Sequence, residues 1–186
     1  MGNKRQTPAK LGQKLRAIRE HLELTAEELI VRLDCPSIRL SRSTIYKYEK
    51  DMREPATEVL LKYARLANVP MEALADGELD LPVLNRKENH ETTRITTKSE
   101  APVGQDKRRI PVKQGRKLKA IREHLGLTQE QMIERLDCSS IPLHTGAITN
   151  YEKNLRDPLS IVLLRYARLA KVHIDDLVDD EIDLLL

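Results

Sequence analysis

The sequence contains no Phe and no Trp, and its 186 residues include only five Tyr. A hydrophobic core must therefore be built from Leu, Ile, Val and Ala. Proteins that stack the bases of single-stranded nucleic acid on aromatic side chains are disfavoured by the same scarcity. The first ten residues contain no apolar run, which predicts neither a signal peptide nor a membrane-spanning helix there. These absences favour a cytoplasmic protein with no membrane partner.

Cysteine is also scarce, since only Cys35 and Cys138 occur. They form no C-x-x-C pair, no disulfide framework and no closely spaced set of metal ligands. Both occupy the same position of an internal repeat, so we interpret them as small core residues of a protein in a reducing compartment. The sequence shows no phosphate-binding loop and no nucleophile–base arrangement. We therefore expect no enzymatic activity, no metal and no cofactor.

The net charge is only +3, but the charge is unevenly distributed. Residues 1–10 carry a net +3 and residues 83–113 a net +4, whereas residues 11–82 and 114–186 each carry −2. Phosphate contacts are local, so the distribution of positive charge matters more than its total. An arm and a central segment are thus the basic parts of the chain.

An internal repeat decides the domain organisation. A shift of 103 residues aligns KLRAIREHLELT (14–25) with KLKAIREHLGLT (117–128), and LLKYARLANV (60–69) with LLRYARLAKV (163–172). Roughly 40 of 70 aligned positions are identical. Self-similarity on this scale indicates a duplicated structural unit.

The repeat predicts four segments along the chain. A basic arm covers residues 1–10, and the two repeated domains cover residues 11–84 and 114–186. The intervening residues 85–113 are polar, basic and without hydrophobic periodicity, which predicts a flexible linker.

Each repeat is predicted to form five helices. Apolar residues at helical spacing predict the first helix of the first repeat over residues 11–22. Thr25 with Glu28 three residues later is a capping box that opens the second helix, and Thr128 with Gln131 repeats the signal. Ser41 caps a third helix, a fourth spans about residues 57–68, and Pro70 opens a short fifth as its first helical residue.

Three stretches of each repeat together resemble one known family. They are LRAIREHLELTAEEL (15–29), STIYKYEKDMREP (43–55), LLKYARLANVPMEAL (60–74), LKAIREHLGLTQEQM (118–132), AITNYEKNLRDP (147–158) and LLRYARLAKVHIDDL (163–177). In this order and spacing they resemble the phage-repressor-like (XRE) helix-turn-helix family. The resemblance covers most of both repeats but not the linker. It implies an all-α fold: two tandem five-helix lambda-repressor-like domains joined by a flexible linker.

One departure from the family concerns the turn between the second and third helices. About five extra residues intervene, PSIRL (36–40) in the first repeat and SSIPL (139–143) in the second. We expect the longer turn to be packed because both copies carry the same apolar residues, namely Ile38, Leu40, Ile141 and Leu143. The insertion affects the pose of the third helix, which is the recognition helix in this family.

By the resemblance, the exposed face of the third helix reads DNA bases. The base-facing positions are Arg42, Ser43, Thr44, Tyr46 and Lys47 in the first repeat, and Thr145, Gly146, Ala147, Thr149 and Asn150 in the second. Arg42 is suited to guanine and Asn150 to adenine. The alternative for the first repeat is an ordinary solvated helix face. The second set has no Lys or Arg, so its alternative is a role in pairing rather than in reading DNA.

Phosphate contacts are expected beside the recognition helix. The resemblance implies this role for Lys50, Arg53, Lys153 and Arg156, and for Gln129 at the first turn of the second helix, where the first repeat has Ala26. It further implies two structural ion pairs between the first and third helices, Arg19 with Glu49 and Arg122 with Glu152.

These observations predict a sequence-specific protein that binds double-stranded DNA. We expect a transcriptional regulator, repressor or activator, that reads two half-sites and is associated with the nucleoid in the cytoplasm. The alternative is an antitoxin-like adaptor whose second repeat mediates pairing. Residues 69–84 and 172–186 mix acidic residues with Leu, which suits a homodimer or intramolecular pairing of the two domains.

Overall fold

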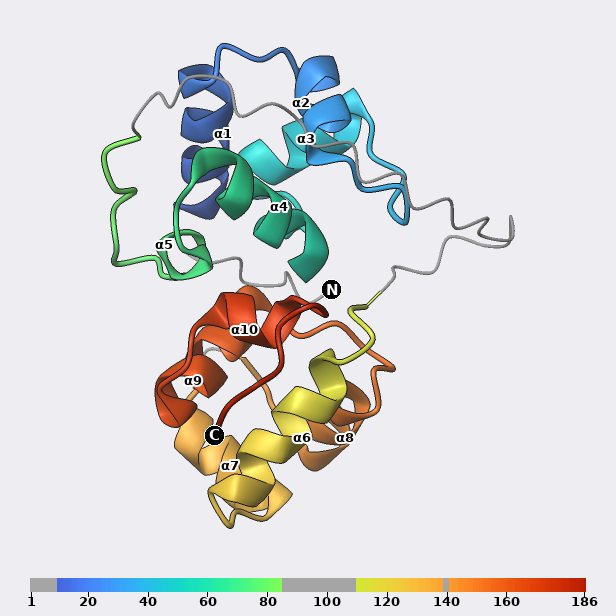
Figure 1. Cartoon of the computed structure of the whole chain (residues 1–186), viewed down its shortest axis with the longest axis vertical. Coiled ribbons are helices and arrows are strands. Elements are labelled where there is room, and N and C mark those ends of the chain that lie inside the picture. The colour runs from blue at the N-terminus through green and yellow to red at the C-terminus, as the bar shows by residue number, and fades with distance from the viewer. Residues whose placement is uncertain (1–9, 85–109, 139–140) are drawn as a thin grey trace.

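The structure of the protein is a computed structural model, and it describes residues 10–84, 110–138 and 141–186. All regular secondary structure in these residues is helical and falls into two units of five helices (Figure 1). The first unit consists of α1 (Leu11–His21), α2 (Ala26–Leu33), α3 (Arg42–Glu49), α4 (Thr57–Ala67) and α5 (Met71–Ala75). The second consists of α6 (Gln114–His124), α7 (Gln129–Leu136), α8 (Thr145–Glu152), α9 (Ser160–Ala170) and α10 (Ile174–Val178). The predicted all-α fold with two tandem five-helix units is confirmed.

Local sequence signals start α2, α7 and α3 where they were predicted. The Thr25 hydroxyl accepts the backbone N–H of Glu28, and the Glu28 carboxylate accepts the N–H of Thr25. Thr128 and Gln131 form the same capping box at α7. The hydroxyl of Ser41 accepts the N–H of Thr44 at the start of α3. Each bond satisfies a backbone donor that the helix itself leaves unpaired.

The short fifth helix begins one residue later than the sequence predicts. Pro70 has φ −66° and ψ 147°, so its backbone is extended and it precedes α5 instead of forming its first residue. The proline ring fixes φ but leaves ψ open, and here ψ takes the extended value. The preceding helix ends at Ala67, after which Asn68 adopts a left-handed conformation that closes α4.

Aliphatic side chains and four tyrosines, two in each unit, fill the cores of the two units. Tyr63 and Tyr166 are completely buried, and their burial raises the pKa of both phenols. Cys35 is buried and Cys138 is half-buried, and both are free thiols. Burial raises the pKa of the Cys35 thiol to about 11, so this thiol stays protonated at neutral pH.

The long turn between α2 and α3 is packed in the first unit. Ile38 and Leu40 lie against the core, and the Ser37 hydroxyl donates to the Glu58 carboxylate of α4 at 2.8 Å. In the second unit Ile141 and Leu143 also lie against the core, while residues 139–140 fall outside the described part of the chain.

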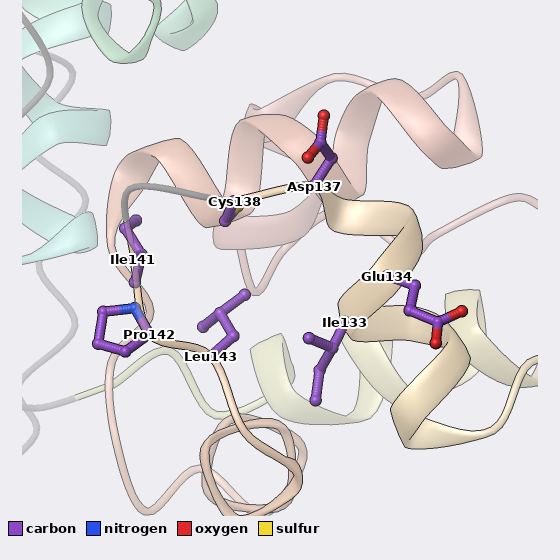
Figure 2. Close-up of a pocket in the computed structure, with 7 residues that line it drawn as sticks. All are labelled: Ile133, Glu134, Asp137, Cys138, Ile141, Pro142 and Leu143. Atoms are coloured by element: carbon purple, nitrogen blue, oxygen red, sulfur yellow. The ribbon is translucent and has the colours of Figure 1, made fainter.

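Beside this turn, the second unit has an open hollow of about 260 Å³ (Figure 2). Ile133 and Leu143 face each other across the hollow, whereas the carboxylates of Glu134 and Asp137 point away from it. Five of its seven lining residues are apolar.

The two units contact each other through α4, α5, α9 and α10 (Figure 1). Neither α4 nor α9 has a side-chain cap of its own, because Ala56 and Leu159 occupy their N-cap positions. Instead, Asp157 of the second unit accepts the backbone N–H of Thr57 at 3.0 Å. Reciprocally, Glu54 of the first unit accepts the N–H of Ser160 at 2.7 Å. Each unit thus caps a core helix of the other.

Four further contacts between the units form two reciprocal pairs. Asp175 accepts the N–H of Met71, and Glu72 accepts the N–H of Ile174. Two ion pairs complete the set, Arg65 with Asp179 and Arg168 with Asp76. In each reciprocal pair, the two residues of one contact occupy the positions equivalent to the two residues of the other, 103 residues away along the chain. The contacts therefore follow an approximate twofold relation between the units.

A buried lysine connects α1 to this contact surface in the first unit. Lys14 is 5% exposed and donates to the backbone carbonyls of Ala73 and Asp76, at the end of α5. Burial lowers the pKa of Lys14, and the nearby Asp76 carboxylate opposes this shift. Lys117 has the same role in the second unit. Lys14 thereby fixes the backbone of Asp76, whose side chain pairs with Arg168 of the other unit.

Two predicted segments fall outside the described residues. These are the basic arm 1–10, apart from Lys10, and the linker 85–113, apart from residues 110–113. The described end of the linker contacts the second unit, where the Asp180 carboxylate accepts the N–H groups of Val112 and Lys113. In the described part of the chain, no helix is long and apolar enough to cross a membrane.

Candidate nucleic-acid interface

The face of α3 directed to solvent carries most of the predicted base-facing residues of the first unit. Ile45 and Tyr48 anchor the opposite face in the core. The exposed residues are Arg42, Ser43, Tyr46 and Lys47. Thr44 is half-buried, and its hydroxyl shares a hydrogen bond with the Ser41 hydroxyl at 2.9 Å. Four of the five predicted side chains therefore face solvent together.

Arg42 has a partner that sequence reasoning missed. Its guanidinium forms an ion pair with Glu27 in the first turn of α2, although the arginine side chain is 79% exposed. A surface ion pair of this kind is weak. It holds the guanidinium near the N-terminal end of α3.

Positive charge gathers at the C-terminal end of α3 and in the turn that follows. The ammonium of Lys50 lies 5.9 Å from the centroid of the Tyr46 ring, which is a cation–π distance. Arg53 is exposed in the next turn, whose backbone folds back so that the N–H groups of Met52 and Arg53 donate to the carbonyl of Lys47. Both predicted phosphate-contacting residues of the first unit therefore lie beside the exposed face of α3.

The matching helix of the second unit, α8, has a different surface. Gly146 is exposed and Thr145, Thr149 and Asn150 are half-buried, but Ala147 is only 3% exposed. Ala147 therefore belongs to the core. The sequence interpretation had placed it on the exposed face of the helix.

The helix cap of α8 also differs from that of α3. His144 takes the place of Ser41, and its Nδ1 accepts the N–H of Ala147 at 3.2 Å. The helix is thus capped by an imidazole instead of a hydroxyl. The local sequence did not indicate this cap, because histidine is not among the preferred capping residues.

Gln129 contacts its own unit. Its side-chain oxygen accepts the Thr149 hydroxyl at 3.1 Å, and its amide group donates to Glu152 at 3.4 Å. Gln129 therefore links the start of α7 to α8. Lys153 and Arg156, the other predicted phosphate-contacting residues of this unit, are exposed after α8.

Helix α1 fixes the position of the recognition helix in the first unit. The Arg19 guanidinium donates two hydrogen bonds to the Glu49 carboxylate, at 2.6 and 2.9 Å. This contact raises the pKa of Arg19. Arg122 and Glu152 form the equivalent pair in the second unit. Both predicted ion pairs between the first and third helices are confirmed.

A second link between α1 and α3 was missed from the sequence. Lys10, at the N-cap position of α1, provides no side-chain cap; instead the Asp51 carboxylate, just after α3, accepts the N–H of Gly12 at 2.7 Å. Asn154 caps Gly115 in the same way. Both capping residues have positive φ, 53° and 55°. Asp and Asn tolerate positive φ better than most residues do. Their presence just after the third helix was the only sign of this conformation in the sequence.

These features converge on one arrangement in each unit. A short helix, α3 or α8, is capped at its N-terminus, packed on one side against the first two helices of its unit, and exposed on the other. In the first unit this exposed side is basic, whereas in the second it is small and polar.

A family model described as helix-turn-helix matches residues 15–74 and, separately, residues 118–177. The two matches correspond to the same part of the two units, from α1 to α5 and from α6 to α10. No curated protein and no solved structure gives a significant match to the chain.

Proposed function

This chain belongs to the XRE-type helix-turn-helix family of DNA-binding regulators, as two tandem copies, and from that membership we propose that a single chain reads two half-sites of an operator in double-stranded DNA. The family consists of DNA-binding domains, not of enzymes. The observation that carries the proposal is the exposed face of α3, where Arg42, Tyr46 and Lys47 stand together. In this family that face enters the major groove.

The two units have unequal parts in this proposal. Arg42 reads a guanine once it leaves Glu27, and Lys50 and Arg53 hold the adjacent phosphates. In the second unit Asn150 reads a base, with Lys153 and Arg156 on the phosphates. Because the two recognition helices carry different side chains, we expect an asymmetric operator.

The contacts between the units support intramolecular pairing. Reciprocal caps and ion pairs hold α4 and α5 against α9 and α10, in place of a contact between two separate chains. The basic arm 1–10 and the basic linker 85–113 add non-specific attraction to phosphate. We infer that the protein is a transcriptional regulator that acts at the nucleoid.

A second candidate function is favoured by the surface of α8. Thr149 is bonded to Gln129, and none of the predicted base-facing positions in this helix carries a positive charge. An antitoxin-like adaptor, in which the first unit binds DNA and the second serves only in pairing, would have such a surface.

Replacing Arg42 tests the assignment of the first recognition helix. With an operator selected from random duplex DNA, Arg42→Ala is expected to weaken binding by about 1–3 kcal/mol and to remove the preference at one base position. Lys50→Ala is the control for a phosphate contact, which should weaken binding to all sequences alike and lower the salt slope by about one. Unchanged affinity and base preference in Arg42→Ala would show that α3 does not read DNA.

Replacing Asn150 decides between the two candidate functions. If the second unit reads bases, Asn150→Ala should relax the preference at one position of the second half-site, at a cost of about 1–3 kcal/mol. Binding titrations on operators altered in either half-site measure the effect, and Lys153→Ala provides the non-specific comparison. An unaltered base preference together with unaltered affinity supports the adaptor.

A further inference from the structure

The reciprocal contacts between the units are similar but not identical. Where the first unit has Glu54 and Thr57, the second has Asp157 and Ser160. The longer acid, Glu54, faces the smaller hydroxyl residue, Ser160. The shorter acid, Asp157, faces the larger residue, Thr57. Each contact therefore contains one carbon atom more than an Asp–Ser contact would. In the Glu54–Ser160 contact this carbon belongs to the acid, and in the Asp157–Thr57 contact it belongs to the hydroxyl residue.

The acids bind their partners in different ways that fit these lengths. Asp157 uses both oxygens, accepting the Thr57 N–H on Oδ2 and its hydroxyl on Oδ1 at 2.7 Å. Glu54 accepts both the N–H and the hydroxyl of Ser160 on Oε1, at 2.7 and 2.6 Å. Thr57 and Ser160 are 1% and 0% exposed. Packed surroundings of this kind respond to a single added or missing carbon.

A second pair of contacts shows the same division. Glu72 of the first unit accepts the N–H of Ile174 at 2.7 Å and lies 3.4 Å from Nδ1 of His173. On the reciprocal side Asp175 accepts the N–H of Met71 at 3.1 Å, and the residue equivalent to His173 is Pro70, which has no donor. In this pair the long acid faces a histidine and the short acid faces a proline. In both of these pairs of contacts the long acid belongs to the first unit and the short acid to the second.

Contacts between like units would lose this match. Two first units would place Glu against Thr, with one carbon too many, and Glu72 would face Pro70. Two second units would place Asp against Ser, with one carbon too few. We propose that these length differences make the contact surface selective for an unlike partner, so that the first unit binds the second of the same chain in preference to a like unit of another chain. The inference rests on the intramolecular pairing in the proposed function.

Two single substitutions reproduce the like-unit contacts within the full chain. Glu54→Asp creates Asp against Ser, and Ser160→Thr creates Glu against Thr. Each is expected to lower the thermal midpoint of the full chain by about 2–4 °C, the shift that a lost helix cap causes in a protein of this length. The double variant Glu54→Asp with Ser160→Thr recreates the Asp–Thr pair of the other side, without the bond that Thr57 there accepts from Gln114 at 3.4 Å, and its midpoint should return to within about 1 °C of the original.

A contact inside one unit provides the control. Glu58→Asp shortens an acid that binds Ser37 of its own unit, so adding Ser160→Thr should not restore its midpoint. Circular dichroism checks that every variant keeps its helix content. Sedimentation equilibrium should find the original chain monomeric, and the two single variants more prone to associate.

The inference would be overturned if the midpoint of the double variant fell by the sum of the two single losses. It would also be overturned if Ser160→Thr restored the midpoint of Glu58→Asp. All measurements are made without DNA. A failure of the operator experiments with Arg42 and Asn150 therefore leaves this result unaffected, and additive losses here leave the DNA-reading role of α3 intact.

Discussion

Gly12→Ala is expected to destabilise the first unit by about 3 kcal/mol, at the upper end of the usual cost of overpacking. A Cβ atom at this position would lie 2.7 Å from the backbone oxygens of both Tyr48 and Glu49. These atoms belong to the backbone of α3, so they cannot turn aside as the end of a side chain would. Helix α1 and the recognition helix must therefore separate. Urea unfolding measures the loss, and operator affinity should fall with it.

Two comparisons isolate the steric effect. Gln13→Ala changes the next residue of α1, which is exposed, and should alter stability by less than about 0.5 kcal/mol. Gly115→Ala makes the equivalent change in the second unit, where backbone oxygens lie 2.6 Å from the added atom, and should cost as much as Gly12→Ala. If Gly12→Ala were as stable as Gln13→Ala, the close contact between α1 and α3 would be wrong.

Arg19→Met is expected to have an effect of similar size, a loss of about 3 kcal/mol. The side chain of Glu49 is only 9% exposed and receives two hydrogen bonds from Arg19. Met keeps much of the arginine's apolar volume but leaves this carboxylate largely buried beside an uncharged side chain. The loss should appear in urea unfolding and should loosen the recognition helix.

The second unit tests the physical reason for this loss. In Arg122→Met, Glu152 keeps a hydrogen bond from the amide of Gln129, so the destabilisation should be smaller than in Arg19→Met. Arg16→Met is the exposed control, since its pair with Glu20 is half-solvated and worth less than about 0.5 kcal/mol. Equal losses in Arg19→Met and Arg16→Met would contradict the structural role of the Arg19–Glu49 pair.

Sequence reasoning succeeded where the determinants are local or repeated. The capping boxes at Thr25 and Thr128 depend on residues three positions apart, and the structure forms both. The duplicated pattern located both units, and the family resemblance identified the Arg19–Glu49 ion pair. The longer turn was recognised as packed because Ile38 and Leu40 recur in the second copy.

It failed where a determinant lies far away in the chain. Asp51 caps α1 across 39 residues, and a lone Asp after a helix carries no sign of that partner. Arg42 was assigned to DNA without Glu27, because only the fold brings the start of α2 to the start of α3. Ala147 was placed on the outer face by analogy with Thr44, yet it is buried, and Thr44 itself is only half-exposed.

The acidic residues near the ends of the units were understood only in part. Their mixture with Leu suggested a surface for pairing. Leu74 and Leu177 are fully buried, and Asp76 and Asp179 form the ion pairs with the other unit. The sequence did not show which arginines these two aspartates would meet, because Arg65 and Arg168 lie on the other unit.

The exchanged helix caps have a consequence for how the protein is made. The chain grows from its N-terminus, and Asp157 is synthesised 100 residues after Thr57. During this interval the start of α4 has no side-chain cap, because Ala56 provides none. A nascent or truncated chain that ends before Asp157 therefore holds a first unit weaker by about 1 kcal/mol, the usual worth of a cap. Completion of the second unit gives the first its final stability.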